Sequence, residues 1–402
     1  MEIEYLDGEQ LDFKDNSPLR SSNQVDHEIA NDKYIRGDVR IVTEQARYPL
    51  NTIVSMVTSS DYNLNPEFQR RHRWSSERKS KLIESFIINV PIPPVFLYEV
   101  RFSEYEVMDG LQRLTAISQF YQDHYALEGL TEWSELNGCT YSTLPEQIRK
   151  GIDRRYLSSI ILLQETAKDP KEAERLKQMV FERINSGGEK LKGQEIRNAL
   201  YPGKLNSLCI KLARNAHFCK MWKIPEPDGD EISNPEIVSD EVISNPLYKD
   251  MSDVELCLRF FAYRQIDSWL GSTMEVFFDE YLKKGTISYS DKLLGELELL
   301  FIDTCHLAFD IFGEKALWLY RVRNGNTIHY ERPTKVLYDP IMHVLSSLIE
   351  KREILLARRE EIIESTEALH LDNQDMFDAR LTTKSAVNAR VSLFKLFFEK
   401  FI

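Results

Sequence analysis

The hydrophobic pattern of this 402-residue chain changes near residue 200, and this change constrains the fold more than any other feature. Before it, short β-rich runs alternate with helical segments, whereas towards the C-terminus apolar residues recur mainly at helical spacing. We therefore predict an α+β chain in which an α/β domain precedes a mostly α-helical domain. The predicted divisions are an N-terminal arm, the α/β domain, a helix with an acidic proline-containing linker, and the helical domain, at residues 1–37, 38–202, 203–248 and 249–402.

Local signals define several elements in advance. Residues 95–100 and 105–108 are rich in β-branched and aromatic side chains and flank a short polar turn, which predicts a hairpin, and residues 158–163 are typical of a buried strand. A helix is expected to start at Pro170, because proline suits the first position of a helix, and to end before two glycines at 187–188. Residues 203–222 are predicted to form a single helix.

The formal net charge of −13 is unevenly distributed along the chain. Residues 1–37 hold nine acids and four bases, and residues 224–255 hold ten acids and one base, so the rest of the chain is close to neutral. We expect the arm to be poorly ordered or loosely docked. A further hypothesis is that the arm and the acidic linker cover a basic surface until DNA displaces them, so that deleting residues 1–37 raises DNA affinity at low salt.

Several classes of protein are disfavoured by composition. No apolar run approaches the ~18 residues of a membrane span, and the acidic first residues do not form a secretory signal. The five cysteines include no Cys-x-x-Cys pair, which favours reduced thiols and a cytoplasmic location. Cys305-His306 and His217-x-Cys219 are interpreted as packing residues, and no metal site is predicted.

The most informative stretch for chemistry is residues 105–121, where a predicted strand leads through Asp109-Gly110 into a helix. In one interpretation Asp109 is the helix N-cap, and Gln112 completes a capping-box-like pair. In the other, the free N–H groups at the helix start bind an anion, and Arg113 adds a bidentate guanidinium suited to phosphate. Both interpretations stay open from the residues alone.

A basic segment precedes this stretch. Residues 70–81 contain six Lys or Arg side chains and one acid, Glu77, with Trp74 among them. A solvated basic face is the simplest interpretation, but tryptophan and arginine together also suit bases and phosphates. The candidate DNA contacts are Arg71, Arg73, Arg78 and Lys79.

Taken in order, the motifs resemble one family. They are Phe68-Gln69-Arg70 with Trp74, Leu82 to Ser85 leading to Val90 to Pro94, Asp109 to Thr115, and Phe181 to Ala199. Together they resemble the N-terminal domain of GmrSD-type restriction endonucleases, whose core is similar to the ParB/sulfiredoxin fold. The resemblance covers roughly residues 45–200, and residues 252–262 are similar to the helical region of stand-alone members.

The resemblance implies a nucleotide site. The family has a nucleotide-associated box, usually Asp-Gly-Gln-Gln-Arg, which here begins at Asp109 and has Leu111 in place of the first glutamine. In family members this box is linked to nucleoside triphosphate binding or hydrolysis, and Asp109 and Arg113 would be the catalytic residues, with Asp109 orienting Mg²⁺ or water. The implied nucleotide-binding residues are Gln69, Arg70, Trp74, Gly110, Gln112, Arg113, Asn185 and Arg197.

The resemblance also implies a function in phage defence. The expected protein is a DNA-directed component of a prokaryotic restriction system that binds, and in one version hydrolyses, a nucleoside triphosphate. Two alternatives stay open: a non-catalytic sensing module that recruits a separate nuclease, and nuclease activity within the ParB-like domain. No His-Asn-His pattern, P-loop or Pro-Asp…Glu-x-Lys signature is recognised in the sequence.

The expected partners follow from the same resemblance. They are DNA, including modified phage DNA, and a separate nuclease or methyltransferase, with no membrane partner. For the C-terminal helices, a homodimer surface, a DNA clamp and a simple scaffold all remain open.

Overall fold

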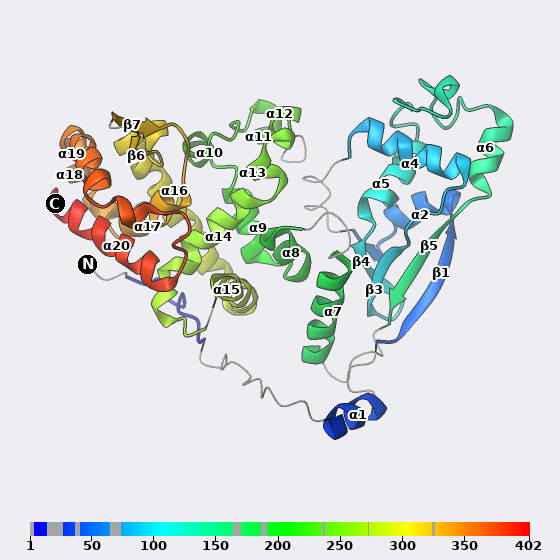
Figure 1. Cartoon of the computed structure of the whole chain (residues 1–402), viewed down its shortest axis with the longest axis horizontal. Helices are drawn as coiled ribbons and strands as arrows, with labels where there is room; N and C mark the ends of the chain where they lie inside the picture. Colours follow the sequence, from blue (N-terminus) through cyan, green and yellow to red (C-terminus); the bar gives the residue numbers. More distant parts are fainter. Residues whose placement is uncertain are drawn as a thin grey trace. The chain divides into compact units, whose positions relative to one another are not determined.

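The chain folds into two compact units in a computed structural model. The α/β unit comprises residues 21–191, and the helical unit comprises residues 192–402 together with residues 1–20 (Figure 1). The structure describes residues 4–13, 27–36, 41–64, 74–163, 170–185, 191–234, 238–271, 273–323 and 326–402. The predicted α+β class, with a mostly helical second part, is confirmed.

A mixed five-stranded sheet forms the frame of the α/β unit, in the order β1-β5-β3-β4-β2. The β3–β4 and β1–β5 pairs are antiparallel, whereas β3–β5 and β2–β4 are parallel. The predicted hairpin and the predicted strand at 158–163 are confirmed as β3–β4 and β5. The strands are β1 (Thr43–Pro49), β2 (Tyr62–Asn63), β3 (Val95–Arg101), β4 (Glu104–Asp109) and β5 (Tyr156–Leu162).

Helices α2, α4, α5 and α6 of the α/β unit bury apolar side chains in one core with the sheet. Ile83 and Phe86 recur three residues apart on α4 and pack in the same cluster as Leu114 and Phe120 of α5 and Val95 of β3. The helices are α1 (His27–Arg36), α2 (Ile53–Thr58), α4 (Ser76–Ile88), α5 (Leu111–Tyr121), α6 (Glu146–Asp153) and α7 (Pro170–Asn185).

A second, larger core holds the helical unit together. Phe261 of α14, Phe301 of α16 and Tyr338 of α17 are fully buried in it. The helices are α8 (Gly193–Leu200), α9 (Lys204–Leu212), α10 (Ala216–Trp222), α11 (Gly229–Ser233), α12 (Asp240–Ser244), α13 (Pro246–Lys249), α14 (Ser252–Arg264), α15 (Met274–Ser288), α16 (Asp291–Phe312), α17 (Lys335–Ser346), α18 (Arg352–Ala357), α19 (Arg359–Asp372) and α20 (Lys384–Glu399). One hairpin, β6 (Leu319–Arg323) with β7 (Asn326–Tyr330), accompanies these helices.

The prediction of a single helix over residues 203–222 is wrong. The segment forms α9 and α10, separated at residues 213–215. The physical reason is a capping residue, because the Asn215 side chain accepts a hydrogen bond from the Phe218 backbone N–H at 3.0 Å and starts a new helix.

The segment predicted as an acidic linker is folded within the helical unit. Its short helices α11 and α12 begin at the capping side chains of Asp228 and Ser239, and Val242 is buried. Arg214 Nε lies 2.6 Å from an oxygen of Glu231, and both side chains are largely buried. Asp228 therefore serves as a helix cap, Glu231 as an ion-pair partner and Pro246 as a helix start, roles that composition does not distinguish from those of a solvated linker.

The described N-terminal residues 4–13 also differ from the expected loose arm. Leu11 and Phe13 are buried in the helical core, and Glu9 is completely buried. Gln265 Nε2 donates to the Glu9 carbonyl at 2.6 Å, and the Leu11 backbone N–H donates to Gln265 Oε1 at 2.8 Å. This segment is thus an integral part of the helical unit.

Among the described helices, none combines the length and the apolar character that crossing a bilayer requires.

Candidate nucleotide site

The candidate site is built on the turn between β4 and α5. β4 ends at Asp109, Gly110 is the N-cap with a φ of 95°, and α5 begins at Leu111. A Cβ at Gly110 would lie 2.3 Å from Val95 Cγ1, so glycine is required both for the left-handed turn and for the close approach to β3. The interpretation of Asp109 as the N-cap is wrong, because no side chain caps α5.

Gly110→Ala should lower the stability of the α/β unit by about 2–5 kcal/mol. The left-handed backbone costs an alanine about 1–2 kcal/mol, and forcing its Cβ against Val95 costs about 1–3 kcal/mol more. Urea denaturation of the full chain measures the loss. Gly151→Ala, on α6 with no atom near the added Cβ, is the matched control and should be neutral or slightly stabilising. Equal stability of the two variants would contradict this account.

Asp109 and Arg113 form an ion pair across one turn at the start of α5. Arg113 Nη2 donates to Asp109 Oδ2 at 2.7 Å, and Arg113 Nη1 donates to the Pro93 carbonyl at 2.8 Å. The Arg113 side chain is 11% exposed, whereas that of Asp109 is 39% exposed. Arg113 therefore orients Asp109 and secures the segment before β3, and Asp109 is the member of the pair presented to solvent.

The start of α4 lies beside the start of α5. The Trp74 backbone N–H donates to Gln112 Oε1 at 3.3 Å, and the Arg78 guanidinium carbon lies 4.7 Å from the centre of the Trp74 ring. Gln112 Nε2 is buried and has no hydrogen-bond partner among the described residues. The fold thus brings together an indole, an exposed guanidinium and a side-chain amide that the sequence places in two separate motifs.

Lys79 follows Arg78 in the sequence but contacts a different part of α5. Its Nζ donates to Gln119 Oε1 at 2.9 Å and lies 5.3 Å from the centre of the Tyr125 ring. The two cations grouped as candidate DNA contacts therefore have different surroundings, because successive residues of a helix point about 100° apart.

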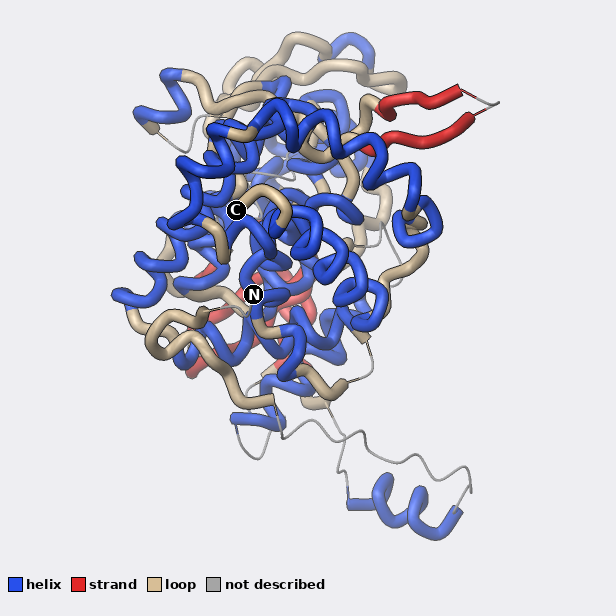
Figure 2. Tube along the Cα trace, turned by 90° about the vertical axis from the view of Figure 1, so that its left-hand side faces the viewer, coloured by secondary structure: helices blue, strands red, loops and turns tan. Residues whose placement is uncertain are grey.

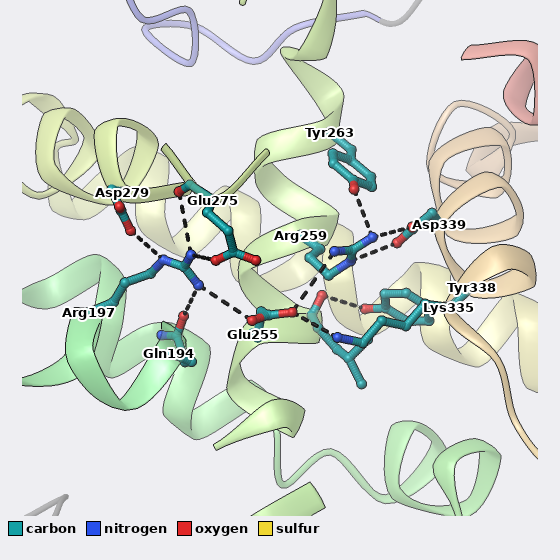
Figure 3. A network of polar contacts seen from close by, with 11 residues as sticks. Gln194, Arg197, Glu255, Arg259, Tyr263, Glu275, Asp279, Lys335, Tyr338 and Asp339 are labelled. Carbon is teal, nitrogen blue, oxygen red and sulfur yellow. Dashed lines mark hydrogen bonds and ion pairs between the residues drawn. The ribbon is translucent and has the colours of Figure 1, made fainter. Parts of the chain in front are cut away.

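Arg197 lies on α8 in the helical unit, where its buried guanidinium joins a network of charged side chains (Figure 3). Its side chain is 1% exposed and forms ion pairs with Asp279 at 2.7 Å, Glu255 at 3.4 Å and Glu275. Burial lowers the pKa of Arg197, but the three carboxylates outweigh this effect and the pKa is raised. The guanidinium is committed to neighbours within its own unit.

Five of the predicted residues cannot be placed from the structure. Gln69, Arg70, Arg71 and Arg73 lie outside the described residues, as does the side chain of Asn185.

Two contacts that support the site have no local sequence signal. Lys177 Nζ of α7 lies 2.6 Å from an oxygen of Glu106, and both side chains are largely buried, so α7 is joined to the strand that ends at Asp109. Glu84 of α4 accepts hydrogen bonds from the backbone N–H groups of Glu132 and Trp133. Each contact joins residues at least 48 positions apart, beyond the reach of helical or strand periodicity.

Comparison with protein families identifies the segment that contains this site. Residues 50–202 match the family model described as GmrSD restriction endonuclease, N-terminal domain. This segment is a GmrSD N-terminal domain. The resemblance drawn from the motifs is confirmed, and the match extends from the α/β unit through α8. No curated protein and no solved structure matches the chain.

In this GmrSD N-terminal domain, Leu111 stands where the family box usually has a glutamine. Its side chain is 6% exposed, so this leucine lies in the interior and is not one of the solvent-facing groups of the site. Among the described residues, no group of three or more His, Cys, Asp or Glu side chains is arranged to hold a metal ion.

Proposed function

We propose that this protein is a nucleotide-binding, DNA-directed component of a restriction system that acts against phage, with the nucleotide held at the start of α5. The family match supports the restriction role. The observation that carries the nucleotide site is the convergence of Trp74, Arg78 and Gln112 beside a helix start that no side chain caps. Uncapped N–H groups and the helix dipole favour phosphate at this position.

Each group has a distinct role in the proposed site. The Trp74 ring offers a face on which a base stacks, and Arg78 offers charge-assisted hydrogen bonds to phosphate. The buried Gln112 Nε2 is a donor for a ligand oxygen, since leaving it without an acceptor costs free energy.

The site also fits a magnesium ion bound with the nucleotide. Mg²⁺ in such sites is usually held by one or two carboxylates together with substrate phosphates, and keeps several waters. Asp109 is a partly exposed carboxylate whose orientation is set by Arg113, so it would hold the ion next to the phosphates. In the hydrolytic version of the proposal, Asp109 also orients the attacking water.

A non-catalytic sensing module is the second candidate, and one observation favours it. Arg113 is turned back onto Asp109 and the Pro93 carbonyl instead of reaching out to a phosphate. A guanidinium that stabilises phosphoryl transfer must contact the transferring group, because its contribution is electrostatic and acts at short range. In this version the bound nucleotide signals to a separate nuclease and is not consumed.

Trp74→Ala should weaken nucleotide binding about 5- to 150-fold. Loss of base stacking on an aromatic side chain costs about 1–3 kcal/mol. Isothermal titration of the full chain with ATP, GTP, CTP and UTP in the presence of Mg²⁺ measures this. Trp133→Ala, which removes an exposed tryptophan of the same unit, is the control and should retain wild-type affinity. A wild-type protein that binds none of the four nucleotides, with or without DNA, would refute the nucleotide site.

The same preparations separate the two candidate functions. Phosphate release by the wild type that is absent in Asp109→Asn at a saturating nucleotide concentration supports hydrolysis. Binding without phosphate release in the wild type, also after addition of modified DNA, supports the sensing module.

A further inference from the structure

One basic segment of the helical unit belongs neither to the nucleotide site nor to the hydrophobic core. Residues 315–332 hold four Lys or Arg side chains and one acid, in a chain whose formal net charge is −13. Within this segment β6 and β7 pair as an antiparallel ribbon. Figure 2 shows the ribbon in red, standing away from the helices of its own unit. The exposed side chains of its outer part are accessible to a partner.

The base of the ribbon is firmly held. The Tyr320 ring stacks on His329 with ring centres 3.9 Å apart and an angle of 9° between the planes. The Tyr320 backbone N–H donates to His370 Nδ1 at 3.3 Å, and burial lowers the pKa of His370 to about 3, so this ring stays neutral and accepts the bond near neutral pH. The ribbon therefore projects in a defined direction from α19.

Cations surround the base of the ribbon. Lys223 and Lys315 lie over the Trp318 ring, with Nζ 4.5 Å and 5.9 Å from its centre. Arg332, just after β7, is exposed. Arg321, further out on β6, is also exposed, and its Nη2 donates to the Phe377 carbonyl at 3.2 Å. The acid of this segment, Glu331, accepts from Lys223 through its backbone carbonyl at 2.8 Å.

The outer part of the ribbon is exposed and carries charged, polar and apolar side chains. Arg321 pairs with Ile328 across the two strands, and Val322 pairs with Thr327. These four side chains are solvent-exposed, and Asn326 beyond them is exposed too. In this outer part an arginine therefore lies next to exposed apolar side chains.

We propose that the β6–β7 ribbon is a DNA-binding element that enters a groove of duplex DNA. The major groove is about 12 Å wide and admits a two-stranded ribbon. In this arrangement the outer side chains face base edges, and the cations at the base of the ribbon contact phosphates. A strongly acidic protein needs such a local concentration of positive charge to approach DNA. The inference rests on the proposed function, because it assigns the surface through which that function reaches DNA.

The test compares two double variants of the full chain, each of which removes two exposed cations. Arg321→Ala with Arg332→Ala changes the ribbon. Lys204→Ala with Lys292→Ala removes the same charge from exposed positions on α9 and α16. Fluorescence anisotropy with a 30-base-pair duplex, unmodified and base-modified, measures affinity between 50 and 200 mM NaCl. Thermal unfolding and the nucleotide titration show whether each variant is folded.

We expect the ribbon variant to bind DNA at least tenfold more weakly, with a slope of log K against log salt that is shallower by about 2. The control variant should stay within twofold of the wild type. Equal DNA affinity of the ribbon variant and the wild type would overturn this inference and leave the proposed function intact. A wild type that binds neither duplex would overturn both the inference and the DNA-directed part of the function, while the nucleotide titration tests the other part separately.

Discussion

Glu9→Ala should lower the free energy of unfolding of the helical unit by about 3–5 kcal/mol, although residue 9 lies in what the sequence predicts to be a loose arm. The Glu9 side chain is 0% exposed and that of its partner Arg264 is 2% exposed. The two groups form a bidentate pair, with Arg264 Nε and Nη2 at 2.6 Å and 2.9 Å from the two carboxylate oxygens. Removing the carboxylate leaves a buried guanidinium without its counter-charge, which is more costly than losing a surface ion pair.

Urea denaturation followed by near-ultraviolet circular dichroism measures this loss, because the helical core is rich in aromatic side chains. Asp7→Ala is the matched control, since Asp7 is an exposed acid two residues earlier in the same segment. Its stability should stay within about 0.5 kcal/mol of the wild type. If the Glu9 and Asp7 variants unfold at the same urea concentration, the N-terminal segment is not a structural part of the unit.

Because of this packing, a deletion of residues 1–37 would not test the effect of the negative charge alone. Such a deletion removes not only an acidic segment but also Glu9, Leu11 and Phe13, which are buried in the helical unit. A change in DNA affinity would then report partial unfolding as well as lost negative charge. The expectation that the arm covers a basic surface stays a prediction, and charge-neutralising changes at exposed acids such as Asp7 test it without disturbing the core.

Arg197→Ala should destabilise the helical unit by about 3 kcal/mol or more. The guanidinium links α8 to α14 and α15 through Glu255, Glu275 and Asp279, and Glu255 in turn contacts Lys335 at 2.8 Å (Figure 3). Glu255 is largely buried, and its pKa is lowered because the neighbouring cations outweigh its burial. Without Arg197, one carboxylate in this interior loses part of that compensation, while the two more exposed ones regain water.

Two substitutions make the test of Arg197 specific. Arg197→Lys keeps the charge but lacks the forked donors that point at three carboxylates, so its stability should lie between those of the wild type and the alanine variant. Lys204→Ala removes an exposed pair with Asp291 in the same unit and should cost less than about 1 kcal/mol. Equal stabilities for the Arg197→Ala and Lys204→Ala variants would show that the network contributes no more than a surface pair. The nucleotide titration of Arg197→Lys then tests the binding role implied by the family resemblance.

The sequence predicted an element correctly where the residues that determine the element are neighbours in the chain. The β3–β4 hairpin and β5 were predicted from β-branched and aromatic runs. The box from Asp109 to Arg113 was located correctly, but the roles within it were not all foreseen. The cap is Gly110 rather than Asp109, because a tight approach to Val95 leaves no room for a Cβ.

The sequence did not predict that some acidic side chains are buried, because their ion-pair partners are distant in the chain. The acids of the N-terminal segment and of residues 224–248 resemble those of solvated segments, since composition does not report a partner. Glu9 meets Arg264 across 255 positions, and Glu231 meets Arg214 across 17. Both acids are buried because the fold supplies a guanidinium at the right place.

The sequence by itself determined the order of elements, the strand–glycine–helix turn and the family of residues 50–202, because these depend on neighbouring residues and on motif spacing. Only the tertiary structure decided which charged side chains are buried, that Arg113 orients Asp109, and that the β6–β7 ribbon projects from the helices of its own unit. The physical reason is that the free energy of a charge depends on its solvation and on its partner, and both are set by residues far away in the sequence.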